Sequence, residues 1–262
     1  MDWDCFAIST AGGVAHLRLS RPERRNAMTE AFWRELPAAV KELEADPAVR
    51  VLVLSSTGPH FSAGLDLAMF QGAQALDTGS VPARLRFRAK LEELQGSLHA
   101  LAQARFPVIA AIQGGCIGGG VDMATACCLR YATRDAWFVI QEINLGMMAD
   151  VGTFNRMPKQ LPEAVVRELG YTGDRLGAER AERLGFVNGL YENHDALVAG
   201  ALEVAARIAS RAPVAVAATK QMISYTRDHG VAESFAYLNA LQPGIFDIEA
   251  IRAALSSQRS TK

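Results

Sequence analysis

Residues 107–122, PVIAAIQGGCIGGGVD, decide the fold that we expect of this chain. The apolar start is typical of a strand buried in a parallel sheet. A glycine-rich turn follows, and a helix is expected over 121–128. The turn does not match G-x-G-x-x-G, because Cys116 stands where that spacing needs glycine, and it lacks the G-K-[ST] of a P-loop. A nucleotide-phosphate cradle of either kind is therefore disfavoured. Two interpretations stay open: free N–H groups at a helix start that bind an oxyanion, or a tightly packed turn.

The segments before and after this stretch alternate between strand and helix patterns. Residues 14–19, VAHLRL, alternate in polarity, and 49–54 form a nearly continuous apolar run, so both predict strands. Thr29 is a suitable N-cap for a helix between them, which Pro37 is expected to kink or shorten. This alternation is typical of an α/β fold. Further segments are expected as a helix at 87–101 and as strands at 129–132, 137–140 and 186–191.

From about Ala196 onward the chain changes to consecutive helical patterns. Breaks are expected near Pro213, Gly230 and Pro243. We therefore divide the chain into an α/β core, 1–195, and a C-terminal helical region, 196–262. The apolar side chains of this region fit either a helical subdomain or a subunit interface; they include Phe235, Tyr237, Leu238, Ile245 and Phe246.

The composition excludes several classes of function. The 262 residues carry 27 Lys and Arg against 28 Asp and Glu, so the basic excess of a nucleic-acid-binding protein is missing. No apolar run approaches 18 residues, so we expect no membrane span. No C-x-x-C pair occurs, and the five histidines do not cluster near the four cysteines, so we expect no metal site. Reduced thiols suit a cytoplasmic location, which we therefore expect.

A second segment with exposed backbone follows the strand at 49–54. Residues 59–66, PHFSAGLD, carry small side chains at 62–64 that let a substrate approach the main chain. Ser62 is not in a G-x-S-x-G motif, so a hydrolase nucleophile is unsupported. An ordinary loop is the alternative. Beyond it, residues 71–84 contain two glycines and a proline and predict a loop or lid.

Three carboxylates stand at strand ends and helix starts, where α/β folds place their sites. Asp122 falls in the first turn of its helix, and Glu142 follows a strand. Asp150 has apolar neighbours that would desolvate it and raise its pKa, as acid–base catalysis near neutral pH requires. The alternatives are a charge against the helix dipole for Asp122, a solvated strand end for Glu142 and an N-cap for Asp150.

Three motifs in this order resemble the crotonase superfamily, the enoyl-CoA hydratase/isomerase family. They are 21–28 (RPERRNAM), 61–66 (FSAGLD) and 118–122 (GGGVD). The resemblance implies a spiral of ββα units followed by helices that trimerise, as a homotrimer or a dimer of trimers. It implies an acyl-CoA thioester as substrate, with no cofactor beyond the coenzyme A that the substrate carries.

The resemblance also implies roles for individual residues. The thioester oxygen would be held by the N–H groups of Leu65 and Gly119. An acid at position 150, beside Asp122 and Glu142, is similar to the Δ3,5-Δ2,4-dienoyl-CoA isomerase branch. Asp150 would then take the C2 proton, Glu142 would supply the C6 proton, and Asp122 would tune or position the site.

Substrate binding and two alternatives complete the expectations. By analogy, the coenzyme A portion would contact Arg24, Ala63, Asp66, Gly118 and Lys220, and residues 66–84 would wall the acyl pocket. An enoyl-CoA hydratase, in which Asp122 and Glu142 activate water, is one alternative. A non-catalytic protein that binds acyl-CoA or another partner is the second.

Overall fold

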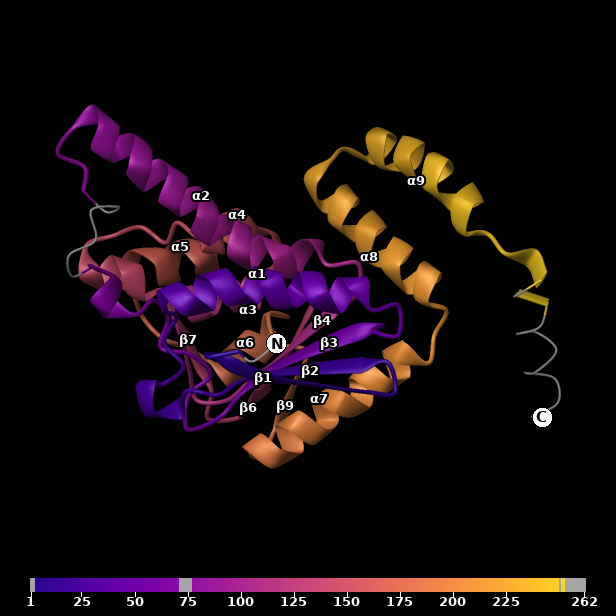
Figure 1. The fold of residues 1–262 in the computed structure, drawn as a ribbon, viewed down its shortest axis with the longest axis horizontal. Coiled ribbons are helices and arrows are strands. Elements are labelled where there is room, and N and C mark those ends of the chain that lie inside the picture. The colour runs from indigo at the N-terminus through magenta and orange to yellow at the C-terminus, as the bar shows by residue number, and fades with distance from the viewer. Residues whose placement is uncertain (1–2, 71–76, 250, 253–262) are drawn as a thin grey trace. The chain divides into compact units, whose positions relative to one another are not determined.

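The computed structural model describes residues 3–70, 77–249 and 251–252. The chain divides into two compact units, Met1–Ser210 and Arg211–Lys262. The first unit is built on a six-stranded sheet in the order β1-β2-β3-β4-β6-β9, which is parallel except for the β1–β2 pair (Figure 1). Its strands are β1 (Phe6–Ala11), β2 (Val14–Leu19), β3 (Val51–Ser56), β4 (Val108–Ile112), β6 (Leu129–Thr133) and β9 (Gly189–Tyr191).

A smaller sheet lies beside the first and makes the fold a spiral. It has the order β5-β7-β8, from β5 (Gly115–Ile117), β7 (Trp137–Val139) and β8 (Leu176–Gly177). The chain passes from β4 in the large sheet to β5 in the small one and then into a helix, and it repeats this path through β6 and β7. The expected spiral of ββα units is therefore confirmed. The helices of this unit are α1 (Glu30–Ala45), α2 (Val81–Gln103), α3 (Gly119–Ala126), α4 (Thr153–Arg156), α5 (Glu163–Thr172), α6 (Ala178–Arg183) and α7 (His194–Ala209).

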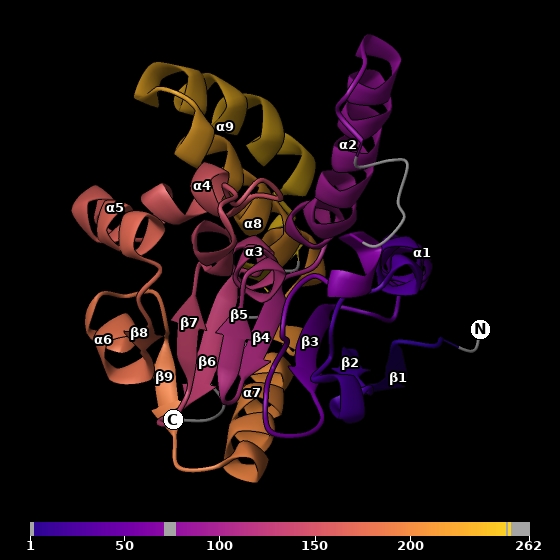
Figure 2. The ribbon, with the colours of Figure 1, turned by 90° about the vertical axis from the view of Figure 1, so that its left-hand side faces the viewer.

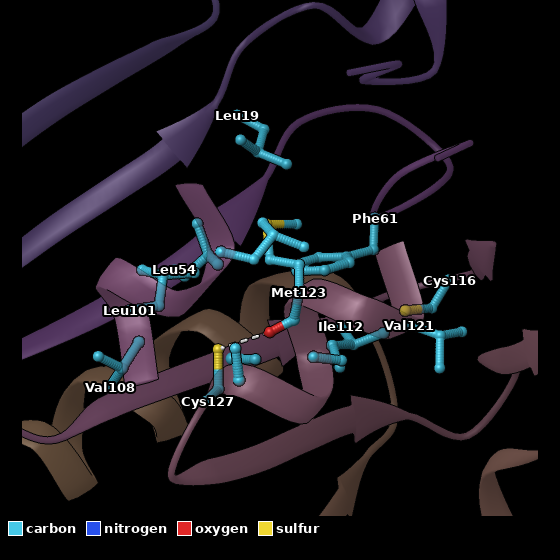
Figure 3. Packing of buried hydrophobic residues seen from close by; sticks show 14 of the residues in the cluster. Leu19, Leu54, Phe61, Leu101, Val108, Ile112, Cys116, Val121, Met123 and Cys127 are labelled. Carbon is cyan, nitrogen blue, oxygen red and sulfur yellow. Dashed lines mark hydrogen bonds between the residues drawn. The ribbon is translucent and has the colours of Figure 1, made fainter. Parts of the chain in front are cut away.

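The central strands of the large sheet, β3 and β4, are buried on both faces, which explains their apolar runs. All six residues of β3 are buried. Leu52 and Leu54 pack into the cluster under α1, α2 and α3, whereas Val51 and Val53 pack against α7. This alternation follows from the two-residue period of a strand. Figure 3 shows the first cluster, where Leu54 lies among side chains from α2, β4 and α3.

Helix α7 covers the second face of the sheet, as Figure 2 shows. Its inward side chains are small or branched: Leu197, Ala201, Ala205 and Ala209. Because this helix packs on the sheet, the division between the compact units falls after Ser210, whereas the predicted boundary lies at 195/196. The difference arises because the small-residue stripe of α7 buries against the strands.

Other expectations also differ from the structure. Helix α1 starts after its predicted N-cap, Thr29, but runs through Pro37 to Ala45. Ser80 caps α2, so 81–84 are helical, whereas the sequence predicts a loop there. Residues 71–76 lie outside the described residues. Strands β1, β5 and β8 are not among the predicted elements.

The second unit contains α8 (Pro213–Asp228) and α9 (Val231–Ile245). The Tyr225 ring stacks on the rings of His229 and Tyr237, with centroids 3.8 and 4.0 Å away. The predicted breaks at Pro213 and Gly230 coincide with helix boundaries, whereas Pro243 lies inside α9. Among the described helices of both units, none is long and apolar enough to cross a membrane.

Candidate active site

A cavity of about 930 Å³ in the first unit brings the three predicted carboxylates together. They reach it from different segments: Asp122 from the first turn of α3, Glu142 from the 3₁₀ turn Gln141–Leu145, and Asp150 from the segment before α4. Leu65 and Gly119 line the same cavity. Its volume falls within the range of small-molecule binding sites.

Leu65 and Gly119 both line the cavity, and each carries a backbone N–H group. Neither N–H is hydrogen-bonded to any group in the described part of the chain. The two segments touch at Gly64, where a Cβ atom would lie 2.6 Å from the Ile117 oxygen and 3.1 Å from the Gly119 nitrogen. Gly64 has φ +79°, which also favours glycine. Two unpaired backbone donors in neighbouring segments are the arrangement that an oxyanion hole requires.

Asn26 holds the first of these segments in place. Its side-chain nitrogen donates to the backbone oxygens of Thr57 and His60 at 2.9 and 3.1 Å. The backbone carbonyl of Asn26 accepts from the Ser62 hydroxyl at 2.9 Å. Met28 continues the link, since its N–H donates to the Gly64 oxygen at 2.8 Å. The sequence motif 21–28 contains Asn26, but its pattern alone does not reveal this clamping role.

Asp122 is almost completely buried, with 1% of its surface exposed. Its Oδ1 accepts a hydrogen bond of 2.6 Å from the Thr153 N–H, at the start of α4. Burial raises the pKa of Asp122 to about 6, although this hydrogen bond opposes the shift. The Asp122 side chain thus accepts from an N–H in the first turn of α4, as an N-cap residue would, although Asp122 belongs to α3. The position of Asp122 in α3 does not predict this contact.

Glu142 lies against the glycine turn. A Cβ on Gly118 would lie 2.8 Å from Glu142 Oε1, so a side chain at this position would displace the carboxylate. Oε2 is buried and has no hydrogen-bond partner among the described residues. Burial raises the pKa of Glu142 to about 7, with a smaller contribution from the charge of Asp122. A protonated carboxyl group is therefore well populated near neutral pH.

Asp150 is the least buried of the three carboxylates. Burial still raises its pKa above the ordinary value. Gln95 from α2 donates to its backbone oxygen at 2.7 Å and fixes this part of the chain. The N-cap alternative for Asp150 is wrong, because α4 begins at Thr153 with Gly152 as its N-cap. Asp150 lines the cavity instead.

The residues predicted to bind coenzyme A separate into two groups. Arg24, Ala63, Asp66 and Gly118 all line the cavity. Lys220 lies on α8 in the second unit and does not line it, so its role stays a prediction. Sequence reasoning missed several wall residues: Phe87, Lys90, Trp137 and Arg175.

One part of the cavity wall is a stack of charged and aromatic groups. The Arg175 guanidinium lies 3.7 Å from the centroid of the Trp137 ring, and the His60 ring meets the same indole at a steep angle. His60 Nδ1 accepts from the Gly115 N–H at 3.0 Å. No group of His, Cys, Asp or Glu residues suited to a metal ion occurs in the described ranges.

We predict that Glu142→Gln stabilises the protein at alkaline pH. The unfolded carboxyl group ionises near pH 4.5, whereas the buried one ionises near 7. Because the folded-state pKa is raised, stability is lost as pH rises through this interval. Glutamine avoids that loss, on the order of 2 kcal/mol above pH 7 and none below about pH 4.5. Thermal unfolding of both proteins at pH 4.5 and pH 8 measures the difference, and an equal effect at both pH values would contradict the prediction.

Comparison with known proteins identifies relatives over nearly the whole chain. The model of the enoyl-CoA hydratase/isomerase family matches residues 9–256. The mitochondrial Delta(3,5)-Delta(2,4)-dienoyl-CoA isomerase of Mus musculus is 38% identical over 95% of this chain and 78% of its own length. The peroxisomal Delta(3,5)-Delta(2,4)-dienoyl-CoA isomerase of Arabidopsis thaliana is 35% identical over 95% of this chain and 91% of its own. The crystal structure of an enoyl-CoA hydratase subunit from Geobacillus kaustophilus superposes with a TM-score of 0.88 at 27% identity, covering 100% of this chain and 97% of that one.

These relatives correct the expected location. The isomerases named above are mitochondrial or peroxisomal proteins. The expectation of a cytoplasmic protein is therefore wrong. It depended on the expectation of reduced cysteines, and a reduced thiol does not distinguish the cytoplasm from the interior of an organelle.

Proposed function

The chain belongs to the enoyl-CoA hydratase/isomerase family, and from this premise we propose that it converts 3,5-dienoyl-CoA to 2,4-dienoyl-CoA. The observation that carries the proposal is the meeting of three carboxylates with two unpaired N–H donors in one cavity of the described chain. The dienoyl-CoA isomerases that match most of the chain support it. Hydration of a 2-enoyl-CoA would not need the third carboxylate.

The reaction moves two double bonds by one carbon each. Asp150 takes a proton from C2, and the electron pair of that C–H bond forms the C2=C3 bond. The C3=C4 pair moves to C4=C5, and the C5=C6 pair takes a proton from Glu142 at C6. Charge develops on the thioester oxygen in between, and the Leu65 and Gly119 N–H groups stabilise it. No atom is oxidised or reduced, so we propose no cofactor beyond the coenzyme A of the substrate.

The pKa values suit this division of labour. Glu142 must begin protonated, and its pKa of about 7 keeps a large fraction in that form. Asp150 must begin ionised, and it is the carboxylate with the most contact with solvent. Asp122 tunes the proton affinity of Glu142, because the negative charge of Asp122 raises the Glu142 pKa. The three groups titrate as a coupled set.

We expect kcat/KM to fall as pH rises through about 7. The acid must carry its proton, and the pH profile of kcat/KM reports the free enzyme. The profile between pH 5 and 9 measures the midpoint of this descending limb. Asp122→Asn removes the neighbouring charge and moves the midpoint to lower pH. A profile that is flat or rising between pH 7 and 9 would contradict the role of Glu142.

One assay tests the proposed reaction. Purified protein is mixed with a 3,5-dienoyl-CoA, and the absorbance of the conjugated 2,4-dienoyl thioester is followed. Hydration of a 2-enoyl-CoA is measured in parallel. Fast isomerisation with little hydration is the expected result. Hydration without isomerisation would favour the hydratase, and thioester binding without either product would favour a non-catalytic protein.

We also propose that the protein forms a homotrimer or a dimer of trimers. The second unit carries large apolar side chains that are exposed when the chain is considered alone, among them Ile223 and Val231. Several large exposed apolar side chains within two successive helices are the composition expected of a subunit interface. Phe235 and Phe246 belong to the same set.

A further inference from the structure

The segment that carries Asp150 has no regular secondary structure. Residues 147–152 lie between the 3₁₀ turn Gln141–Leu145 and α4 and belong to no helix or strand. Two apolar side chains anchor this segment, because Ala149 and Val151 are buried in the cluster under α1, α2 and α3. Asp150 stands between them, is only partly buried and lines the cavity. Apolar contacts are not directional, so they hold the segment down without fixing the orientation of its peptide groups.

A single directional contact reaches this segment from another element. The side-chain nitrogen of Gln95, on α2, donates to the Asp150 backbone oxygen at 2.7 Å. Within the described ranges of the chain, no other hydrogen bond joins residues 148–151 to another element. Because a hydrogen bond of this length requires good alignment, Gln95 orients the peptide group that follows Asp150. The direction of the Asp150 side chain depends on the same backbone.

Helix α2 connects this contact to the wall of the cavity. Leu91 and Leu94, which precede Gln95 on the same helix, line the cavity, whereas Gln95 does not. Gln95 can therefore affect a bound substrate only through the residues that it holds. Its hydrogen bond ties the segment of Asp150 to a helix that forms part of the substrate-binding wall.

We propose that Gln95 is a positioning residue, which holds Asp150 in the place that removal of the C2 proton requires. This inference rests on the proposed function, because that function makes Asp150 the base. A misplacement of about 1 Å can cost roughly 10² in rate, even when the altered residue is remote from the reacting atoms. Loss of the Gln95 hydrogen bond should therefore lower kcat and leave KM nearly unchanged, since Gln95 does not line the cavity.

Steady-state kinetics of Gln95→Met with a 3,5-dienoyl-CoA is the direct test. Methionine matches glutamine in length but has no donor, and Ala149 and Val151 still anchor the segment in the core. We expect kcat to fall roughly 10- to 100-fold, with KM within about twofold of the wild-type value. Gln95→Asn is the second variant, because its amide is withdrawn by one methylene while the position stays polar, and its kcat should fall in the same direction.

Two further measurements distinguish a positioning role from a merely structural one. Gln103→Met is the matched control, because Gln103 is exposed at the end of the same helix, contacts His99 and does not line the cavity. It should keep the wild-type kcat. A double-mutant cycle combines Gln95→Met with Asp150→Asn. If Gln95 acts through Asp150, its replacement costs little further rate once the base has been removed.

The outcomes separate this inference from the proposed function. Wild-type kcat in the Gln95 variants, an equal loss in Gln103→Met, or a rise in KM without a fall in kcat would overturn the positioning role. The same fold-loss of kcat in the Asp150→Asn background would overturn it as well, since the effect would then not pass through Asp150. In each of these cases the isomerase activity itself would stand. A wild-type protein that isomerises no dienoyl-CoA would refute the proposed function, and the inference would fall with it.

Discussion

We expect Glu142→Gln and Asp150→Asn each to lower kcat/KM for 3,5-dienoyl-CoA by roughly 10²–10⁴, the range for loss of a general acid or base. The amide introduced by Glu142→Gln is a far weaker acid than a carboxyl group with a pKa of about 7, so C6 receives its proton slowly. The amide introduced by Asp150→Asn offers no basic oxygen for the C2 proton. Steady-state kinetics of the purified variants measures both losses.

Two comparisons protect this test from misinterpretation. Asp135→Asn changes the net charge by the same amount at an exposed position that does not line the cavity, and it should keep wild-type activity. Glu142→Gln is also expected to be more stable than wild type above pH 7, so its loss of activity cannot come from unfolding. If either carboxylate variant kept nearly the full wild-type rate, the assignment of proton transfers would be refuted.

The gain in stability and the loss of rate that we expect of Glu142→Gln have one physical origin. Burial raises the pKa of Glu142 and Asp122, and burying a carboxylate opposes folding once it ionises. A core selected for stability alone would hold neutral side chains at both positions. The protein keeps the carboxylates where they are unfavourable, which is the pattern expected of an active site.

The sequence predicts the local parts of this site better than their connections. The strand before the glycine turn, the first turn of α3 and the N-cap at Thr29 all follow from neighbouring residues, and the structure has them. Strand β5 escapes prediction because it is three residues long and exists through its pairing with β7, a strand that begins only at Trp137. Its residues carry no alternating pattern that would announce a strand.

The contacts of the carboxylates depend on the fold in the same way. Asp150 looks like an N-cap from its neighbours, but the N–H of Thr153 is taken by Asp122, 31 residues earlier in the chain. The clamp made by Asn26 joins the segments at 57 and 60 and is equally remote in sequence. Side chains that act across the fold become predictable only when the strand order is known. The family resemblance implied a spiral of ββα units, and the strand order itself is known only from the structure.

Gly64→Ala is expected to lower kcat/KM by roughly 10²–10³, the loss seen when one oxyanion donor is removed. The new Cβ would lie 2.6 Å from the Ile117 oxygen and 3.1 Å from the Gly119 nitrogen. Both are backbone atoms, so no side chain can rotate away, and the two segments must separate. The Leu65 and Gly119 N–H groups then no longer reach one oxygen together.

Gly185→Ala is the control for backbone strain. Gly185 has φ +80°, close to the +79° of Gly64, but a Cβ there meets no atom within 4 Å. Both variants thus share the cost of a left-handed alanine, roughly 1 kcal/mol, and only Gly64→Ala disturbs the donor pair. Equal losses of rate in the two variants would show that strain, rather than the spacing of the N–H groups, limits the reaction. Full activity in Gly64→Ala would contradict the proposed oxyanion hole.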